Sequence, residues 1–232
     1  MQWTLVVPLK PLARAKSRLS DAAADELRPG LALAFAQDTV AAALACPAVK
    51  DVAVVTDDPL AGRELGALGA HIVSDEPGGG LNAALAHAVA VVRSSRPETP
   101  VAALNADLPA LRPLELARVL DAAAQFPRAF LADAAEIGTT LLTAAPGQEL
   151  RPSFGTDSRA RHRESGAREL DLAEVDSVRQ DVDTGADLRA ALALGVGPRT
   201  ATAVARLAAT PSGARGTARP APTAPHPNHN GS

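Results

Sequence analysis

The stretch Val101-Ala-Ala-Leu-Asn-Ala-Asp107-Leu-Pro109 decides how the fold is read. It begins as an uncharged apolar run, which is typical of a strand buried on both faces of a sheet. It then changes to Asn105, Asp107 and a proline that cannot donate to a ladder, so the strand ends there. In α/β proteins, ligands lie at the carboxyl ends of parallel strands. Asp107 is therefore a candidate metal or phosphate-site residue, although Asp and Pro are also ordinary turn residues.

Strand-like and helix-like segments alternate along the rest of the chain. Short apolar runs are separated by Ala-rich segments, and Pro113 opens one of the helices at a position that suits proline. The expected strands are residues 3–9, 49–56, 71–74, the stretch quoted above, 129–132, 139–144 and 175–183. This order predicts an α/β fold with a mostly parallel central sheet and helices on both faces. Thr184-Gly-Ala-Asp187 has the form of a capping box and is expected to begin a last helix.

Length and composition narrow the class of protein. With 232 residues, the chain suits one α/β domain, expected over residues 1–208, followed by a disordered Pro/Ala-rich tail at 209–232. Aromatic residues make up only 2% of the chain and the formal net charge is −3. Both values argue against a nucleic-acid partner, because stacking surfaces and a basic field are missing.

Membrane and export signals are not visible in the sequence. No apolar run approaches the ~20 residues that cross a bilayer, and the first strand starts without a signal peptide. The single cysteine, Cys46, excludes a disulfide within the chain. We therefore expect a cytoplasmic protein without a membrane partner. The sequence leaves the oligomeric state open, a homo-oligomer included.

A basic segment follows the first expected strand. It holds Lys10, Arg14, Lys16 and Arg18, and no acidic residue precedes Asp21. In α/β folds the turn after the first parallel strand commonly binds nucleotide phosphates, whose charge these cations could neutralise. The alternative is an ordinary solvated face, although such a face usually mixes both signs of charge.

Two further carboxylates stand two residues apart, at Asp181 and Asp183. On a strand, side chains with this spacing point to the same face, and two like charges held together require a cation. Carboxylate oxygens suit Mg²⁺, which typically takes one or two carboxylates together with substrate phosphates. If Asp107 joins the pair, the three residues predict a metal-assisted nucleotidyl transfer site. The alternative is that one carboxylate begins the last helix and the other is solvated.

Small polar residues mark two other candidate binding segments. Thr139 and the run from Gly155 to Ser158 supply hydroxyl groups and free backbone N–H groups next to an arginine-rich stretch, which suits a small phosphorylated acid. An ordinary helix cap is the alternative for Ser158. Gly80 ends a run of three glycines that lets the backbone approach a flat ligand, and the amide of the nearby Asn82 could bind a base or a ribose. A plain flexible loop is the alternative there.

Taken together, these segments resemble the guanylyltransferase family that makes the precursor of the deazaflavin coenzyme F-420. The resemblance covers roughly residues 1–208, and the family includes enzymes for 2-phospho-L-lactate and for phosphoenolpyruvate. It rests on six motifs in this order: Pro8-Leu-Lys-Pro-Leu-Ala-Arg-Ala-Lys16-Ser-Arg-Leu, Gly80-Leu-Asn82-Ala-Ala-Leu, Asn105-Ala-Asp107-Leu-Pro, Gly138-Thr-Thr-Leu-Leu, Phe154-Gly-Thr-Asp-Ser158 and Asp181-Val-Asp183-Thr. Each motif alone is unspecific, but the six in this order are specific.

The resemblance implies a nucleotide-diphospho-sugar-transferase-like, Rossmann-like α/β fold, with GTP as the nucleotidyl donor and Mg²⁺ as the cofactor. It also implies that the metal ligands are Asp107, Asp181 and Asp183, and that the phosphorylated acid contacts Thr139, Gly155 and Ser158. For the nucleotide, we predict contacts with Lys10, Arg14, Lys16, Gly80 and Asn82, with Asp107 and Lys16 as the catalytic residues. The wider nucleotidyltransferase superfamily usually has a glycine-rich loop after the first strand, and cations replace it here.

The reaction implied by this resemblance joins GMP from GTP to a phosphorylated acid and releases pyrophosphate. An Ala- and Arg-rich composition is typical of high-GC bacteria, which favours phosphoenolpyruvate over 2-phospho-L-lactate as the acid. With phosphoenolpyruvate the product is enolpyruvoyl-2-diphospho-5'-guanosine. Two other readings remain open: a nucleotidyltransferase for molybdopterin or a sugar phosphate, and a non-catalytic nucleotide-binding protein.

Overall fold

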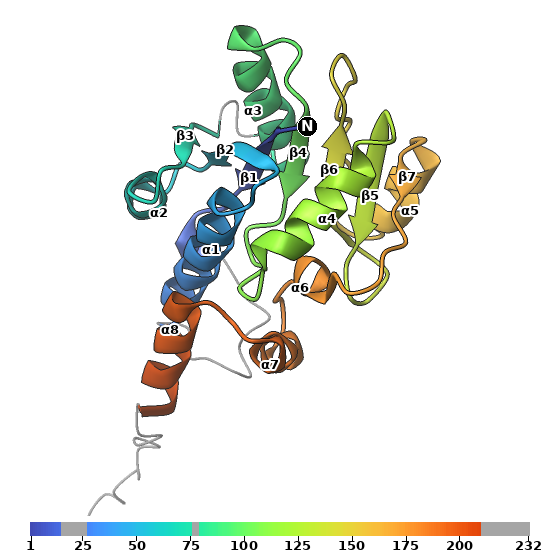
Figure 1. Ribbon diagram of the computed structural model, residues 1–232. Helices are drawn as coiled ribbons and strands as arrows, with labels where there is room; N and C mark the ends of the chain where they lie inside the picture. The colour runs from blue at the N-terminus through green and yellow to red at the C-terminus, as the bar shows by residue number, and fades with distance from the viewer. Residues whose placement is uncertain (15–26, 76–78, 210–232) are drawn as a thin grey trace, which may run out of the picture.

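The computed structural model of this chain describes residues 1–14, 27–75 and 79–209 (Figure 1). Its strands form one seven-stranded sheet with the order β3-β2-β1-β4-β6-β5-β7. They are β1 (Trp3–Pro8), β2 (Val49–Val55), β3 (His71–Val73), β4 (Val101–Leu104), β5 (Arg128–Ala132), β6 (Thr139–Ala144) and β7 (Arg168–Glu169). The predictions for Lys16 and Arg18 and for the tail beyond residue 209 lie outside the described residues.

The sheet is mixed but mostly parallel. β1 pairs in parallel with β2 and β4, β2 pairs in parallel with β3, and β5 pairs in parallel with β7. Of the described strands, β6 alone runs against its neighbours, because it pairs antiparallel with both β4 and β5. The carboxyl ends of the other six strands and the beginning of β6 therefore lie at the same edge of the sheet. The prediction of a mostly parallel sheet is confirmed.

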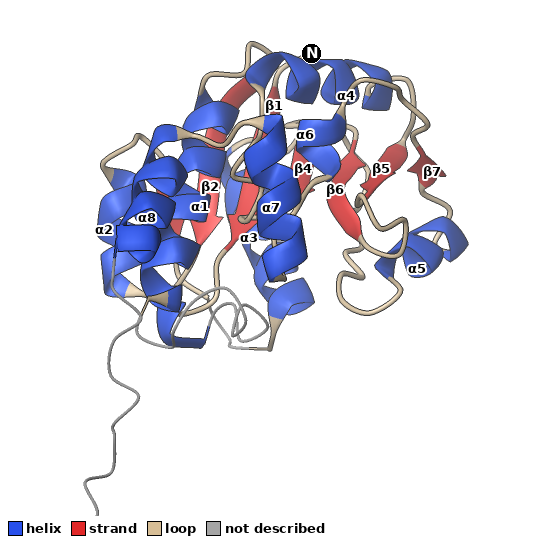
Figure 2. Ribbon diagram, turned by 90° about the horizontal axis from the view of Figure 1, so that it is seen from below, coloured by secondary structure: helices blue, strands red, loops and turns tan. Residues whose placement is uncertain are grey.

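Helices cover both faces of this sheet (Figure 2). They are α1 (Arg28–Leu44), α2 (Pro59–Gly66), α3 (Leu81–Ser95), α4 (Pro113–Ala123), α5 (Ser158–Glu164), α6 (Asp176–Arg179), α7 (Gly185–Leu194) and α8 (Pro198–Ala209), with a 3-10 turn η1 at Leu12–Arg14. Leu5 and Val7 of β1 belong to the same core as residues of α1, α2, α4 and α6, whereas Val6 belongs to the core that includes α3 on the other face. Successive strand residues point to opposite faces, so β1 contributes to both cores.

Local sequence explains where several helices begin. A proline stands in the first turn of α1, α2 and α4, where its missing N–H costs no hydrogen bond. At the start of α7, the side chain of Thr184 accepts from the backbone N–H of Asp187, and the Asp187 carboxylate accepts from the backbone N–H of Thr184. The predicted capping box is therefore confirmed.

The prediction of a strand at residues 175–183 is wrong. This segment forms the short helix α6 and then an irregular stretch that continues to α7. Its apolar residues Val175, Val178 and Val182 are three and four positions apart, which is a helical spacing, and all three are fully buried. The edge of the sheet is instead occupied by the two-residue strand β7, which the sequence does not predict.

The larger core holds the only tryptophan and the only cysteine of the chain. Trp3, at the start of β1, is completely buried, and Cys46 is a buried free thiol. Most of their neighbours in this core are Ala, Val and Leu, as the composition predicts. In the described part of the chain, no helix has the length and apolar character needed to cross a bilayer.

The last helix, α8, packs against α1 (Figure 1), where a buried carboxylate holds its first turn. Asp38 of α1 is 5% exposed, and its carboxylate accepts from the backbone N–H groups of Thr200, at 2.7 Å, and Arg199, at 3.2 Å. A Cβ at Gly197 would lie 2.3 Å from the Asp38 carboxyl carbon, so only glycine fits there. This contact also supports a third apolar core, in which α1, α7 and α8 surround Val182.

Replacing Asp38 by Ala is expected to lower the free energy of unfolding by about 1–2 kcal/mol, because the first N–H groups of α8 lose their buried acceptor. Urea unfolding followed by circular dichroism measures the change. Thr202→Ala, an exposed substitution on the same helix, serves as the control and should stay within about 0.5 kcal/mol of the wild type. An Asp38→Ala protein as stable as this control would contradict the capping role.

Candidate functional site

The predicted site residues that the structure describes gather around one edge of the sheet. Lys10 follows β1 and is exposed, Asn82 lies in the first turn of α3 after β3, and Asp107 follows β4. Thr139 begins β6, and the reversed direction of this strand brings it to the same edge. The edge is the one at which α/β folds bind their ligands.

Asp58 connects the loops after β1 and β2. One of its carboxylate oxygens accepts from the backbone N–H of Leu12 at 2.9 Å, and the other caps α2 by accepting from Leu60 and Ala61. Burial alone would raise the pKa of Asp58, but these three N–H donors outweigh it and lower the pKa. The loop that carries Lys10 is thus held by a carboxylate. Its Asp-Pro sequence before a helix is an N-cap signal that our sequence analysis did not use.

Asp107 lies beside the segment that carries the two other predicted metal ligands. The backbone N–H of Val182 donates to the carbonyl of Asp107 at 3.0 Å, and the Asn105 amide donates to the Asp181 carboxylate at 3.4 Å. Val182 is buried in the third core and anchors the segment, whereas the next residue, Asp183, is exposed. Two parts of the chain that are distant in sequence therefore meet after β4, although the segment is not the strand that we predicted.

The chemistry of these carboxylates fits Mg²⁺, which binds oxygen ligands and commonly completes its coordination with substrate phosphates. Within residues 1–14, 27–75 and 79–209, no group of three or more His, Cys, Asp and Glu side chains is arranged to hold a metal ion. The assignment of Asp107, Asp181 and Asp183 to one magnesium site therefore stays a prediction. It is a prediction for the complex with nucleotide, in which phosphate oxygens would supply further ligands.

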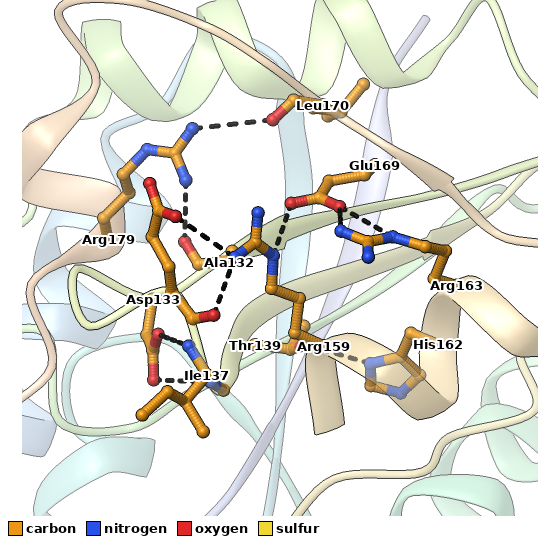
Figure 3. Close-up of polar contacts among 12 residues, drawn as sticks. Ala132, Asp133, Ile137, Thr139, Arg159, His162, Arg163, Glu169, Leu170 and Arg179 are labelled. Atoms are coloured by element: carbon orange, nitrogen blue, oxygen red, sulfur yellow. Dashed lines mark hydrogen bonds and ion pairs between the residues drawn. The ribbon is translucent and has the colours of Figure 1, made fainter. Parts of the chain in front are cut away.

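Thr139 and Ser158, the residues predicted for the phosphorylated acid, are brought together by the β5–β6 turn. Both side chains are nearly fully buried, and the backbone N–H of Arg159 donates to the carbonyl of Ile137 at 3.1 Å, which ties α5 to this turn. Asp133 shapes the turn by accepting from the backbone of Ile137 and Gly138 (Figure 3). A Cβ at Gly138 would lie 2.3 Å from the Asp133 carboxylate, so any other residue at this position would displace that carboxylate.

Gly155 occupies a conformation that suits glycine. Its φ is +114°, and a Cβ would lie 3.3 Å from the guanidinium of Arg161. The Arg161 guanidinium donates to the carbonyls of Phe154 and Thr156, so it fixes the loop around Gly155. The contact of Gly155 with a ligand stays a prediction, but the positive φ and the nearby guanidinium explain why a glycine stands at this position.

His162, in the arginine-rich stretch that follows Gly155, is a buried member of this site. Its Nδ1 lies 2.9 Å from the Thr139 hydroxyl (Figure 3), and its Nε2 accepts from the backbone N–H of Ser153 at 2.9 Å. The ring is fully buried against Phe130 and Phe154. Burial, with the nearby Arg128 and Arg161, lowers the pKa of His162 to about 4. The imidazole is therefore neutral at physiological pH.

Asn82 has a structural contact that the sequence does not predict. Its amide oxygen accepts from the backbone N–H of Phe154 at 2.8 Å, and its amide nitrogen donates to the carbonyl of the same residue at 3.1 Å. This pair of hydrogen bonds joins the start of α3 to the loop that carries Gly155. Contacts of Asn82 and of Gly80 with the nucleotide stay predictions.

Two of the three arginines of α5 form ion pairs with neighbouring carboxylates. Arg159 and Arg163 both pair with Glu169 of β7 (Figure 3), and Arg159 also pairs with Glu136. Burial would raise the pKa of Glu169, but the two guanidinium groups lower it. These side chains line a surface pocket of about 560 Å³ that also includes Arg179. Ion pairing therefore reduces the positive potential of the arginine-rich stretch beside the acid site.

We expect the free energy of unfolding to fall as the pH is lowered from 6.5 towards 4. The unfolded chain takes up a proton on His162 in this range, whereas the folded chain excludes it until the pH reaches the lowered pKa. The full loss of unfolding free energy is on the order of 3 kcal/mol, and none of it occurs above the pKa that His162 has in the unfolded chain. Urea unfolding at several pH values measures it, with His162→Gln as the variant that lacks the titrating group. Equal pH slopes in both proteins would contradict this assignment.

Comparison of the sequence with known proteins identifies the family of this chain. The model of the family described as "Guanylyl transferase CofC like" matches residues 3–218. A protein of Streptomyces coelicolor named phosphoenolpyruvate guanylyltransferase is 83% identical over 207 residues, which cover 89% of this chain and 98% of the relative. A protein of the same name from Thermomonospora curvata is 60% identical over 92% of this chain and 93% of its own length.

Solved structures confirm the predicted fold. A nucleotidyl transferase from Methanothermobacter is 19% identical, with a TM-score of 0.57 over 83% of this chain and 97% of its own. A CMP:2-keto-3-deoxy-manno-octonic acid synthetase in complex with CTP gives a TM-score of 0.55 at 18% identity, over 84% and 98% of the two chains. At such identities the likeness concerns the fold, which is the expected nucleotide-diphospho-sugar-transferase-like α/β fold. By its sequence, the chain belongs to the CofC-like guanylyl transferase family.

Proposed function

We propose that this protein transfers GMP from GTP to phosphoenolpyruvate, with release of pyrophosphate, in the biosynthesis of coenzyme F-420. The observation that carries the proposal is the 83% identity, over nearly the whole length of the relative, to a protein named phosphoenolpyruvate guanylyltransferase. The gathering of the predicted nucleotide and acid residues at one edge of the sheet supports it.

In the proposed reaction, an oxygen of the acceptor phosphate attacks the α-phosphorus of GTP. A P–O bond forms between the two phosphates, the bond from the α-phosphorus to the bridging oxygen breaks, and pyrophosphate leaves with the electron pair. Both substrates are anions, so charge neutralisation and alignment supply most of the catalysis. The chain needs no nucleophile of its own, because the acceptor provides it.

The basic segment after β1 is the proposed binding site for the leaving phosphates. Lys10 is exposed and Arg14 ends the η1 turn, so both follow β1 within one short loop. The loop is held by the Asp58 carboxylate through the backbone N–H of Leu12. Cations carried by a fixed loop can neutralise phosphate charge without a large ordering cost on binding. Lys16 continues this segment and is proposed as its catalytic cation.

The proposed acid site uses Thr139, Gly155 and Ser158. The hydroxyl groups of Thr139 and Ser158 suit phosphate or carboxylate oxygens, and the backbone at Gly155 can approach a ligand closely. Because 2-phospho-L-lactate carries the same two anionic groups as phosphoenolpyruvate, it is the second candidate for this site. The names of the similar proteins favour phosphoenolpyruvate.

The carboxylates after β4 and before α7 are the proposed magnesium ligands. A bound Mg²⁺ would offset the charge of the phosphates at this edge of the sheet. Asp107 and Asp181 are half-buried and lie in segments joined by the Val182 hydrogen bond, which supports their assignment to one site. As the compartment we propose the cytoplasm, since the single buried thiol suits a reducing environment.

Pyrophosphate release with purified protein tests the reaction. We expect release with GTP, Mg²⁺ and phosphoenolpyruvate, and its loss when EDTA removes the metal, because the substrate charges are then not neutralised. Side-by-side assays with 2-phospho-L-lactate, 3-phosphoglycerate and a sugar phosphate, and with ATP or CTP in place of GTP, define the specificity. Release only with a sugar phosphate would overturn the proposed acceptor. Equal release in EDTA would overturn the proposed need for Mg²⁺.

Asp107→Asn is expected to lower kcat by at least about 100-fold, since an amide cannot replace the negative charge at this position. The circular dichroism spectrum should stay unchanged, because the residue follows β4 and is only half-buried. Asp121→Asn, which alters an exposed carboxylate of α4, is the matched control and should keep wild-type kcat. A fully active Asp107→Asn enzyme would remove Asp107 from the catalytic site.

A further inference from the structure

We propose that His162 is a positioning residue of the acid site, which donates a hydrogen bond to Thr139 and thereby turns the Thr139 hydroxyl proton towards the phosphorylated acid. The inference rests on the proposed function, since it assigns a task to a side chain that supports the same site. His162 is fully buried and its two ring hydrogen bonds go to Thr139 and Ser153, so its effect must pass through its neighbours.

The hydrogen-bond partners of the ring fix its tautomer. The backbone N–H of Ser153 is a donor and points to Nε2 at 2.9 Å, so Nε2 carries no hydrogen. In the neutral ring the hydrogen then resides on Nδ1, which faces the Thr139 hydroxyl oxygen at 2.9 Å. His162 is therefore the donor in this contact, and the hydroxyl oxygen is the acceptor.

The consequence for Thr139 is a defined direction of its own proton. A hydroxyl group that accepts one hydrogen bond keeps its O–H for another acceptor. Within the described residues, the Thr139 hydroxyl has no other hydrogen-bond partner than His162. A phosphate or carboxylate oxygen of the acid is the acceptor that the proposed function supplies, and a charged acceptor strengthens such a bond.

The same ring also sets the distance between the two parts of the acid site. Through Ser153 it holds the segment that continues to Gly155 and Ser158, and through Thr139 it holds the start of β6. Phe130 and Phe154 pack on the ring, with centroids 5.8 and 5.0 Å away, and limit its rotation. A side chain that is locked by packing and by two hydrogen bonds can pre-orient a binding group.

The charge state of His162 agrees with this role. Burial and the neighbouring Arg128 and Arg161 lower its pKa to about 4, so the ring stays neutral under working conditions. A protonated ring would carry a hydrogen on Nε2 as well, opposite the N–H of Ser153, and the two donors would repel each other. The neutral tautomer is the form that satisfies both contacts.

Two substitutions separate the two hydrogen bonds of the ring. His162→Gln keeps an acceptor near the position of Nε2 but loses the donor to Thr139, whereas His162→Asn keeps a donor near the position of Nδ1. We expect His162→Gln to raise the KM for phosphoenolpyruvate about tenfold, the size of one hydrogen bond to a charged group, with the KM for GTP changed less than about twofold. His162→Asn should restore most of the affinity for the acid.

A double-mutant cycle shows whether His162 acts through Thr139. Thr139→Val removes the hydroxyl, so adding His162→Gln to that variant should cause no further rise in the KM for phosphoenolpyruvate. A merely structural role would instead give additive effects of the two substitutions on the KM for phosphoenolpyruvate and a similar change in the KM for GTP. Thermal unfolding of each variant identifies any that lose the fold.

The outcomes distinguish this inference from the proposed function. An inactive wild type with GTP and phosphoenolpyruvate would overturn the proposed function and, with it, the role of His162 towards this acid. An active wild type with an unchanged KM in His162→Gln, or with additive effects in the cycle, would overturn the inference alone. Independently of turnover, ¹⁵N NMR of the wild-type ring should show the Nδ1–H tautomer between pH 5.5 and 8, and the Nε2–H tautomer would refute it.

Discussion

The reversed direction of β6 is the constraint on which the site depends. If β6 were parallel to β4, its first residue would lie at the opposite edge of the sheet from Asp107. Because it is antiparallel, the backbone N–H of Asn105 donates to the carbonyl of Thr140 at 2.9 Å, just where β4 ends. The residues proposed for the nucleotide and for the acid therefore meet at one edge, although different strands carry them.

Hydrogen bonds between distant segments then fix the geometry of that edge. The bond from Val182 to Asp107 uses backbone atoms and is backed by the burial of the valine, so it holds the acidic segment in place. On the other side, the amide of Asn82 binds both polar groups of the Phe154 backbone, as a neighbouring strand would. The acid site is thus joined to α3 on one side and to the β5–β6 turn on the other.

Much of the fold follows from local patterns in the sequence. Runs rich in apolar residues give β1, β2 and β4, and proline or a capping box marks the start of α1, α2, α4 and α7. The direction of β6 depends on pairing between distant strands, which no local pattern contains. Residues 175–183 predict a strand because their apolar and polar residues roughly alternate, although the valines in this segment also have a helical spacing. β7 is too short to produce a pattern. α8 is amphipathic, but it begins at the proline of a Gly-Val-Gly-Pro sequence, which is typical of a loop.

The site was predictable to a similar extent. The end of β4 and the motifs of the family point to Asp107, Thr139 and Ser158 without the structure. Asp58 and His162 act through contacts with Leu12, Ser153 and Thr139 that form only on folding. A histidine inside an arginine-rich stretch looks solvated in a single sequence, and only its burial shows that it belongs to the interior.

The burial of Trp3 has a consequence for the optical properties of the protein. The chain contains no tyrosine, so this indole is the only strong near-ultraviolet chromophore and fluorophore that the polypeptide offers. It lies at the first residue of β1, roughly 17 Å, or five residues of extended chain, from the edge that carries the candidate site. Its emission will therefore report the integrity of the sheet as a whole, while the arrival of a ligand at the far edge leaves it largely unchanged.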